Sequence, residues 1–151
     1  MTQIDFYHLT QSDLHTALVI LLHKTASVGK KALILCPKPA ASALDDMLWT
    51  HDENAWMPHG VDDADGASHA NIWISTDPAA NQIAAEFAFL THGVEPAVMT
   101  DFARAFVLFD GRSEAQVQQA REQWKRFSAA DNVTASYFAQ YDGGRWQKKA
   151  G

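Results

Sequence analysis

The feature that most constrains this chain is a pair of short apolar runs with no polar alternation. KALILC (31–36) and RAFVLFD (104–110) are strand-length runs of branched and aromatic residues. Such runs are typical of strands buried on both faces, as in a parallel sheet covered by helices, whereas a strand with one wet face would alternate. We therefore expect a sheet that is shielded from water on both sides.

Further strands are predicted on either side of these runs. IDFYHL (4–9) is rich in aromatic and branched residues. NIWIST (71–76) and EFAFLT (86–91) have the same character, although alanines before the second leave a helix open. SYFAQYDGGRWQKK (136–149) places aromatics around an Asp-Gly-Gly turn and predicts a terminal strand or hairpin.

Two helices are predicted in the first third of the chain. Ser12 is the expected N-cap of the first, with Asp13 in its first turn and Gly29 ending it at the C′ position. Its apolar face is expected to comprise Leu14, Ala17, Leu18, Leu21, Leu22 and Thr25. The second helix is expected over about 40–50, and the residues expected to face inward are Ala43, Leu44, Met47 and Leu48. The polar stretch 51–70 is expected to be mostly loop.

A third helix is predicted near the C-terminus, around AREQWKRF (120–127). Ser113 and Gln116 form a capping-box pattern at its start. One face is apolar at helical spacing: Val117, Ala120, Trp124 and Phe127. Arg121 and Lys125 each follow an apolar position and should border that stripe. Cations and a tryptophan are thus concentrated in a chain of net charge −6.

Strands that alternate with helices predict a mostly parallel sheet with helices on both faces. We therefore expect a single α/β domain over residues 1–151, with a Rossmann-like three-layer arrangement.

Composition excludes several classes of function. A pI near 5.5 disfavours a dedicated DNA binder, so we expect any contact with DNA to be indirect. Neither a signal peptide nor an apolar run of membrane-spanning length is evident, so we expect no membrane partner. The single cysteine, Cys36, is compatible with a reducing compartment, and a cytoplasmic location is expected.

The sequence contains no recognisable catalytic or cofactor motif. HLTQSDLH (8–15) follows the first strand without the glycines that a dinucleotide site needs. Neither the seven histidines nor the acidic DDADG (62–66) has metal-ligand spacing. We expect no cofactor and favour a binding or assembly protein over an enzyme. The alternative is a small α/β enzyme or nucleotide-binding protein whose site is built from loops such as 51–69.

Several segments, in order, resemble the chi subunit of bacterial DNA polymerase III holoenzyme. They are FYHL, KALILC, LDDMLWTHDENAWMPHG, IWIS, RAFVLFDG, AREQWKRF and YFAQYDGGRW. The resemblance implies a non-catalytic replisome adaptor with a Rossmann-like fold and no nucleotide chemistry. It also implies two partners, namely the psi subunit of the clamp-loader assembly and the acidic, phenylalanine-ended C-terminal tail of single-stranded DNA-binding protein.

The resemblance assigns the tail to the third helix. Arg121, Trp124 and Lys125 fall on the family's tail-binding positions, with Val117 where another lysine is expected. Cations elsewhere could compensate for the missing lysine: Arg104, Arg112, Lys148 and Lys149. The alternative is that Val117 and Trp124 only pack on the sheet and that both cations are ordinary solvated residues.

The resemblance places the psi subunit near two other tryptophans, Trp49 and Trp56. Trp49 closes the second helix, and Trp56 lies in a polar stretch where nothing requires an aromatic side chain. Exposed aromatics often anchor interfaces because they bury a large area at low entropic cost. The alternative is that both tryptophans pack at the end of the sheet as a satellite of the core.

Overall fold

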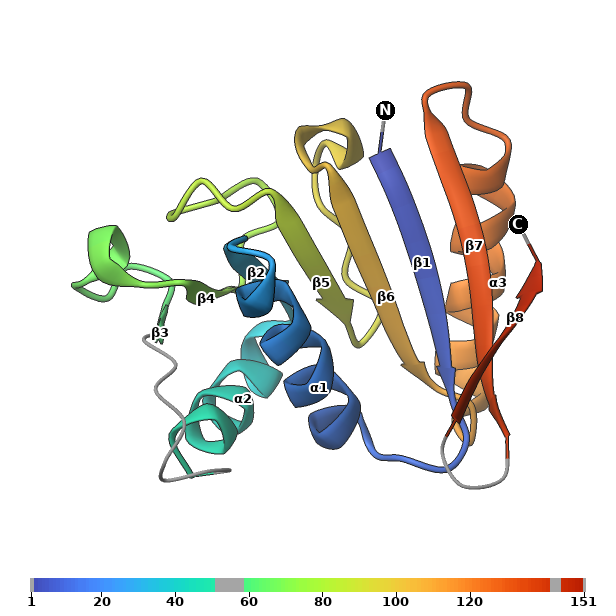
Figure 1. The fold of residues 1–151 in the computed structure, drawn as a ribbon, viewed down its shortest axis with the longest axis horizontal. Coiled ribbons are helices and arrows are strands. Elements are labelled where there is room, and N and C mark those ends of the chain that lie inside the picture. The colour runs from blue at the N-terminus through green and yellow to red at the C-terminus, as the bar shows by residue number, and fades with distance from the viewer. Residues whose placement is uncertain (1, 51–58, 142–144, 151) are drawn as a thin grey trace.

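A computed structural model describes residues 2–50, 59–141 and 145–150. These residues form an eight-stranded sheet and three α-helices (Figure 1). The helices are α1 (Leu14–Ser27), α2 (Lys38–Thr50) and α3 (Glu114–Ser128). The strands are β1 (Thr2–Leu9), β2 (Ala32–Leu35), β3 (His59–Val61), β4 (Ile72–Ser75), β5 (Phe87–Thr91), β6 (Arg104–Asp110), β7 (Val133–Tyr141) and β8 (Arg145–Ala150).

The strand order is β3-β4-β2-β5-β6-β1-β7-β8, and β8 is the antiparallel edge strand of an otherwise parallel sheet. The α/β class and the mostly parallel sheet are therefore confirmed, and the finer Rossmann-like three-layer description stays a prediction. The chain's first strand lies in the middle of the sheet, where Phe6 faces Val107 of β6 on one side and Tyr137 of β7 on the other.

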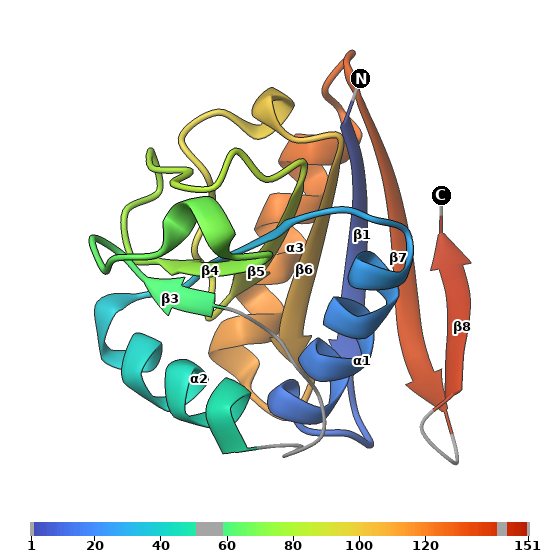
Figure 2. The same cartoon turned by 60° about the vertical axis from the view of Figure 1, so that its left-hand side comes forward.

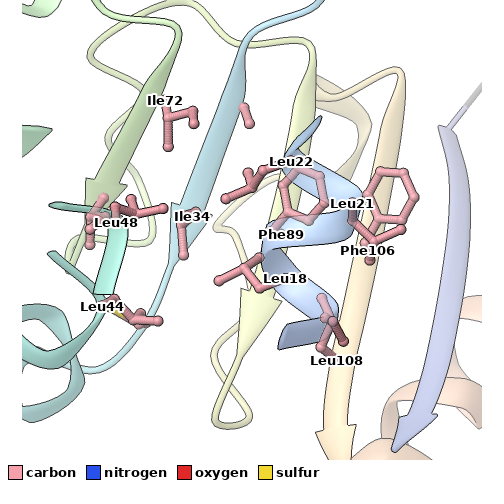
Figure 3. Close-up of a cluster of buried hydrophobic side chains, with 14 of the residues drawn as sticks. Leu18, Leu21, Leu22, Ile34, Leu44, Leu48, Ile72, Phe89, Phe106 and Leu108 are labelled. Carbon is pink, nitrogen blue, oxygen red and sulfur yellow. The ribbon is translucent and has the colours of Figure 1, made fainter. Parts of the chain in front are cut away.

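The apolar runs form the buried centre of the sheet, as expected. β2 and β4 are buried along their whole length, and β6 is buried at each of its five inner positions. Helices α1 and α2 pack against one face, where the leucines of α1 and α2 meet Ile34, Phe89 and Phe106 (Figure 3). Helix α3 lies against the opposite face, over a second cluster that includes Phe6, Val107 and Phe109 (Figure 2).

Helix ends differ in detail from the expectation. The N-cap of α1 is Asp13, not Ser12, and its carboxylate accepts the N–H of Thr16 at 2.8 Å. Gly29 has a φ of +73°, the left-handed conformation predicted for the C′ residue. Only half of the predicted capping box forms on α3. The Ser113 hydroxyl accepts the N–H of Gln116, but the Gln116 side chain accepts the N–H of Asp110 instead of returning to Ser113.

Two predictions in the middle of the chain need correction. Ala43 is exposed rather than inward, and Ala41 takes the buried position one half-turn earlier, because α2 begins at Lys38. Within the stretch expected to be mostly loop, residues His59–Val61 form strand β3 and Ala67–His69 form a 3-10 turn. Alternation could not reveal a strand of three residues. The terminal hairpin is confirmed by the antiparallel pairing of β7 with β8.

Candidate peptide-binding surface on helix α3

Helix α3 is held to the sheet mainly by half-buried aromatic contacts. Trp124 stands edge-on to Phe6 at 5.5 Å and to Tyr137 at 5.9 Å between ring centroids. Phe127 lies 6.4 Å from Phe6, and Val117 packs against the same cluster. The side chains predicted for the apolar face therefore do pack on the sheet, with Ala120 fully buried among them.

The cations of AREQWKRF divide into two groups. Arg126 pairs with Glu95, whose carboxylate also accepts an amide hydrogen of Gln123 at 3.2 Å. These contacts hold the pKa of Glu95 below its ordinary value, chiefly through the hydrogen bond from Arg126. Arg121 and Lys125 lie on the other side of the helix, are exposed, and make no ion pair within the described residues.

Arg121 borders a hollow of about 580 Å³ on the outer side of the first turns of α3. The hollow is lined by Gly111, Glu114, Ala115, Val117, Gln118 and Arg121. The structure thus brings Val117 and Arg121 together on one concave surface. Trp124 and Lys125 do not line it: Trp124 is turned toward the sheet, and Lys125 continues the cationic edge one turn beyond Arg121.

Two residues that the sequence analysis did not single out lie near Arg121. His8 and Tyr137 share a hydrogen bond of 2.6 Å between Nδ1 and Oη. Burial lowers the pKa of His8, the charge of Arg121 lowers it further, and Asp110 opposes both. Burial raises the pKa of Tyr137, and Arg121 acts against that rise. These effects indicate that the charge of Arg121 reaches both rings, which a pattern within one helix could not reveal.

Gly111 fixes the start of this surface. Its N–H donates to the carbonyl of Leu9 at 2.7 Å, and a Cβ at this position would collide with the His8 ring and lie 2.8 Å from that same carbonyl. Any side chain here would displace His8 or the turn that leads into α3. The FDG sequence before the helix therefore has a structural reason, since only glycine permits so close an approach.

Of the four cations suggested as substitutes for the lysine missing at Val117, two are ion-paired and a third lies on the opposite face of the sheet. Arg104 lies on the opposite face of the sheet, where its guanidinium donates to Asp5. Arg112 pairs with Asp110 and also donates to the carbonyl of Ser12. Lys148 is opposite Phe138, on the α1 side of the sheet. Lys149 is exposed at the sheet edge, and its part in a tail site stays a prediction.

Of the two tryptophans predicted at the psi surface, only Trp49 lies in the described part of the chain. The Trp49 side chain is 61% exposed, and its ring lies 4.5 Å from that of His59, whose Nε2 is 3.1 Å from an Asp45 carboxylate oxygen. Trp49 is thus a large exposed apolar group held by a buried histidine. The prediction for Trp56 falls on residues 51–58, outside the described part of the chain.

The backbone N–H groups of the loop after β1 are hydrogen-bonded within the protein. In nucleotide-binding α/β proteins this loop offers its N–H groups to phosphate. Here the N–H groups of Thr10, Gln11 and Ser12 all donate to one oxygen, Oε1 of Gln140, at 2.9–3.1 Å. The position that a phosphate oxygen would take is filled by a side chain of β7.

The described residues also bring together no three His, Cys, Asp or Glu side chains that could hold a metal ion. None of the helices in the described ranges has the length and apolar content of a membrane span. Cys36 is fully buried, and burial raises the pKa of its thiol to about 11, as befits a packing residue.

The structure is that of an α/β protein with a mostly parallel sheet, two exposed cations on α3 and a loop after β1 that is bonded to Gln140. A family model described as DNA polymerase III chi subunit, HolC, matches residues 1–134. The chain therefore belongs to the DNA polymerase III chi subunit family and is a protein of DNA replication. The match ends before YFAQYDGGRW (137–146), one of the segments on which the resemblance rests. A search of curated proteins gave no match.

Proposed function

We propose that this chain is a non-catalytic, cytoplasmic adaptor of the replisome, folded as one domain over residues 1–151. It joins the psi subunit of the clamp-loader assembly to the acidic C-terminal tail of single-stranded DNA-binding protein. Membership of the chi family supports association with DNA polymerase III. The observation that carries the tail proposal is the pair of exposed cations, Arg121 and Lys125, without ion-pair partners in the described residues, beside the hollow that Val117 and Arg121 line.

The chemistry of the hollow suits a peptide that ends in phenylalanine. The guanidinium of Arg121 can hold a terminal carboxylate through two hydrogen bonds at once, and Lys125 offers a point charge to the aspartates that precede it. Val117 and the aliphatic part of Gln118 give the phenyl ring an apolar wall. Glu114 lies in the same hollow and would repel a carboxylate. We therefore propose that the terminal carboxylate binds at the Arg121 end.

A titration with a synthetic acidic tail peptide tests this proposal. The wild-type protein should bind the peptide, and the affinity should fall as salt rises, because partly exposed charges are screened over about 8–10 Å at ordinary ionic strength. A peptide without its terminal phenylalanine should not bind at any salt concentration. A tail peptide that bound equally well without its phenylalanine would place the contact outside the hollow and leave only a nonspecific charge effect.

The psi surface is proposed at Trp49 and Trp56. Trp49 supports it by its exposure, since a 61% exposed tryptophan at a helix end contributes little to the core. Replacement of Trp49 or Trp56 by Ala should cost roughly 2 kcal/mol or more in psi binding, the range of an interface anchor. The thermal midpoint should stay near that of the wild type. A loss of stability with unchanged psi affinity would show that these side chains pack internally.

A further inference from the structure

The sheet face that carries α1 and α2 is not fully covered by them. Two hollows, of about 470 and 260 Å³, lie along α1 on this face. The larger lies between α1 and residues of β5 and β6, and the smaller lies between α1 and residues of β7 and β8. Tyr7, Leu21 and Lys24 line both, so the two hollows adjoin. Together they form a groove along α1 that β8 borders at the smaller hollow, which we call the α1–β8 groove. It lies on the opposite face of the sheet from α3.

One end of the α1–β8 groove has apolar walls. Tyr7 stacks on Phe138 at 5.2 Å and meets Trp146 edge-on at 4.9 Å between ring centroids, which builds the sheet side. Ile20, 49% exposed, and Leu21 form the helix side. Phe138 and Trp146 lie beyond the segment that the family model matches, so the chi family match does not account for this wall.

The charge in the groove is opposite to that of the chain as a whole. Its lining includes Lys24, Lys30 and Arg104 and no carboxylate, in a chain of net charge −6. Arg104 is held by the buried Asp5, and Lys30 by Glu86. Lys24 is exposed and makes no ion pair within the described residues.

A further lysine stands on the sheet side of the groove. Lys148 is opposite Phe138 and two residues beyond Trp146, so its side chain rises on the same face of β8 as the tryptophan. The groove therefore has an exposed lysine on each side of its aromatic floor.

From these features we propose that the α1–β8 groove is a second docking site, for an internal peptide segment in which bulky apolar side chains are flanked by carboxylates. The apolar side chains enter between Ile20 and Trp146, and the carboxylates face Lys24 and Lys148. This site goes beyond the proposed function. It lies on the other face of the sheet from α3, and it requires no chain terminus.

The shape of the aromatic wall favours a peptide over single-stranded nucleic acid. Nucleic acid would need an open ring face on which a base can stack. Tyr7 is 8% exposed, with Phe138 against one face and the edge of Trp146 beside it, and Phe106 is 4% exposed. The rings cover one another, whereas the gap between Ile20 and Trp146 suits an inserted side chain.

The probe for this site is a fluorescent Asp-Asp-Leu-Trp-Asp-Asp hexapeptide, acetylated and amidated so that it has no terminal carboxylate. Binding is measured by anisotropy, and the bound surface is mapped by amide chemical-shift changes in the full chain. The wild type should bind it with shifts centred on α1 and β8. Ile20→Asp and Lys24→Glu should each weaken binding about tenfold, because one puts a carboxylate in the apolar wall and the other sets like charges together.

Matched controls separate this site from general charge attraction. Lys38→Glu makes the same charge change at an exposed position outside the groove and should leave binding within about twofold. Ile20 and Lys24 are both exposed, so each variant should melt near the wild-type temperature.

Three results would overturn the proposal: no binding of the probe by the wild type, equal loss in Lys38→Glu and Lys24→Glu, or shifts centred on α3. Displacement of the probe by oligothymidylate with shifts at the same groove residues would assign the groove to nucleic acid instead.

Discussion

The two faces of the sheet hold their helices by opposite means. Helix α1 buries an unbroken apolar stripe, and five of its residues are buried. Helix α3, one residue longer, buries Ala120 and Gln123 and rests on half-buried aromatics and on polar ties to Glu95 and Asp110. Because α1 uses its apolar stripe on the sheet, a partner can meet only residues beside that stripe, such as Ile20 and Lys24. A helix seated as lightly as α3 keeps one side free for exposed cations.

A cavity in the core beneath α1 tests most directly whether this helix is held by apolar burial. Leu22→Ala should lower the free energy of unfolding by about 3 kcal/mol, because Leu22 is 1% exposed and its removal leaves a cavity between α1 and the sheet. Tail-peptide affinity should be unchanged at temperatures where the variant is folded. Denaturant unfolding gives the first quantity and peptide titration the second. A loss below 1 kcal/mol would mean that the two faces are held alike.

Trp124 tests whether α3 combines both roles. Trp124→Ala should lower the free energy of unfolding by about 2 kcal/mol, less than full burial would cost, because the ring is only half-buried against Phe6 and Tyr137. Tail affinity should also fall, since the ring supports the helix that carries Arg121. Trp124→Phe is the control and should recover most of the stability. Full stability in Trp124→Ala would make the tryptophan a pure contact residue.

Substitution of the exposed cations of α3 should weaken tail binding without lowering the stability of the fold. Arg121→Ala should cost roughly 1.5–3 kcal/mol of tail binding, as for hydrogen bonds to charged groups, and Lys125→Ala about 0.5–1 kcal/mol, as for a solvated ion pair. Neither change should shift the thermal midpoint, because both side chains are exposed. Arg126→Ala, which removes the pair with Glu95, is the matched control and should reduce stability more than tail binding. Unaltered affinity in Arg121→Ala would move the tail site elsewhere.

The smallest expected effect is one of pH. His8 has a lowered pKa, through burial first and Arg121 second, so it is neutral near pH 7 and gains a proton only below its ordinary range. The stability that neutral His8 contributes is present above about pH 6.5 and is lost as the pH falls through the lowered value. Tail affinity should move the other way and rise roughly twofold between pH 7.5 and 5.5, because the new cation faces an anionic peptide.

His8→Gln should remove that rise in affinity while leaving binding at pH 7.5 near the wild-type value. The aspartates of the tail stay ionised throughout this range, since their ordinary pKa is about 3.9. A rise that persists in His8→Gln would assign the proton to another group, and a fall in wild-type affinity would contradict the placement of the peptide near Arg121.

The sequence could predict what depends on residue pattern along one element. The buried strands, the apolar face of α3 and the left-handed Gly29 follow from spacing and backbone sterics, and each is present. Side-chain partners from distant segments were beyond reach. The ion pairs that engage Arg104 and Arg126 depend on where β1 and the 93–95 loop lie. The effect of the Arg121 charge on the pKa values of His8 and Tyr137 likewise depends on where β1 and β7 lie.

Local patterns also fail where two solutions are chemically equal. Ser12 and Asp13 are both good caps, and only the geometry of the turn selects Asp13. The side chain of a glutamine at N3 can accept the N–H of the cap residue or that of a residue in the preceding strand, and Gln116 accepts the N–H of Asp110. In such cases tertiary contacts decide between alternatives that the sequence leaves nearly degenerate.

The contact between Gln140 and the loop at Thr10–Ser12 has a consequence for the order in which the chain can fold. It joins residues separated by up to 130 positions, and β1 itself pairs with strands that begin about a hundred residues later. β1 precedes the other strands along the chain, yet its two partners, β6 and β7, follow only after β2 to β5. Contacts between distant segments must overcome the entropy of closing long loops. β1 can therefore pair only once β6 and β7 have been made, whereas the strands from β2 to β5 can assemble earlier. We therefore expect slow folding, with the loop after β1 ordering only when the last hairpin has docked.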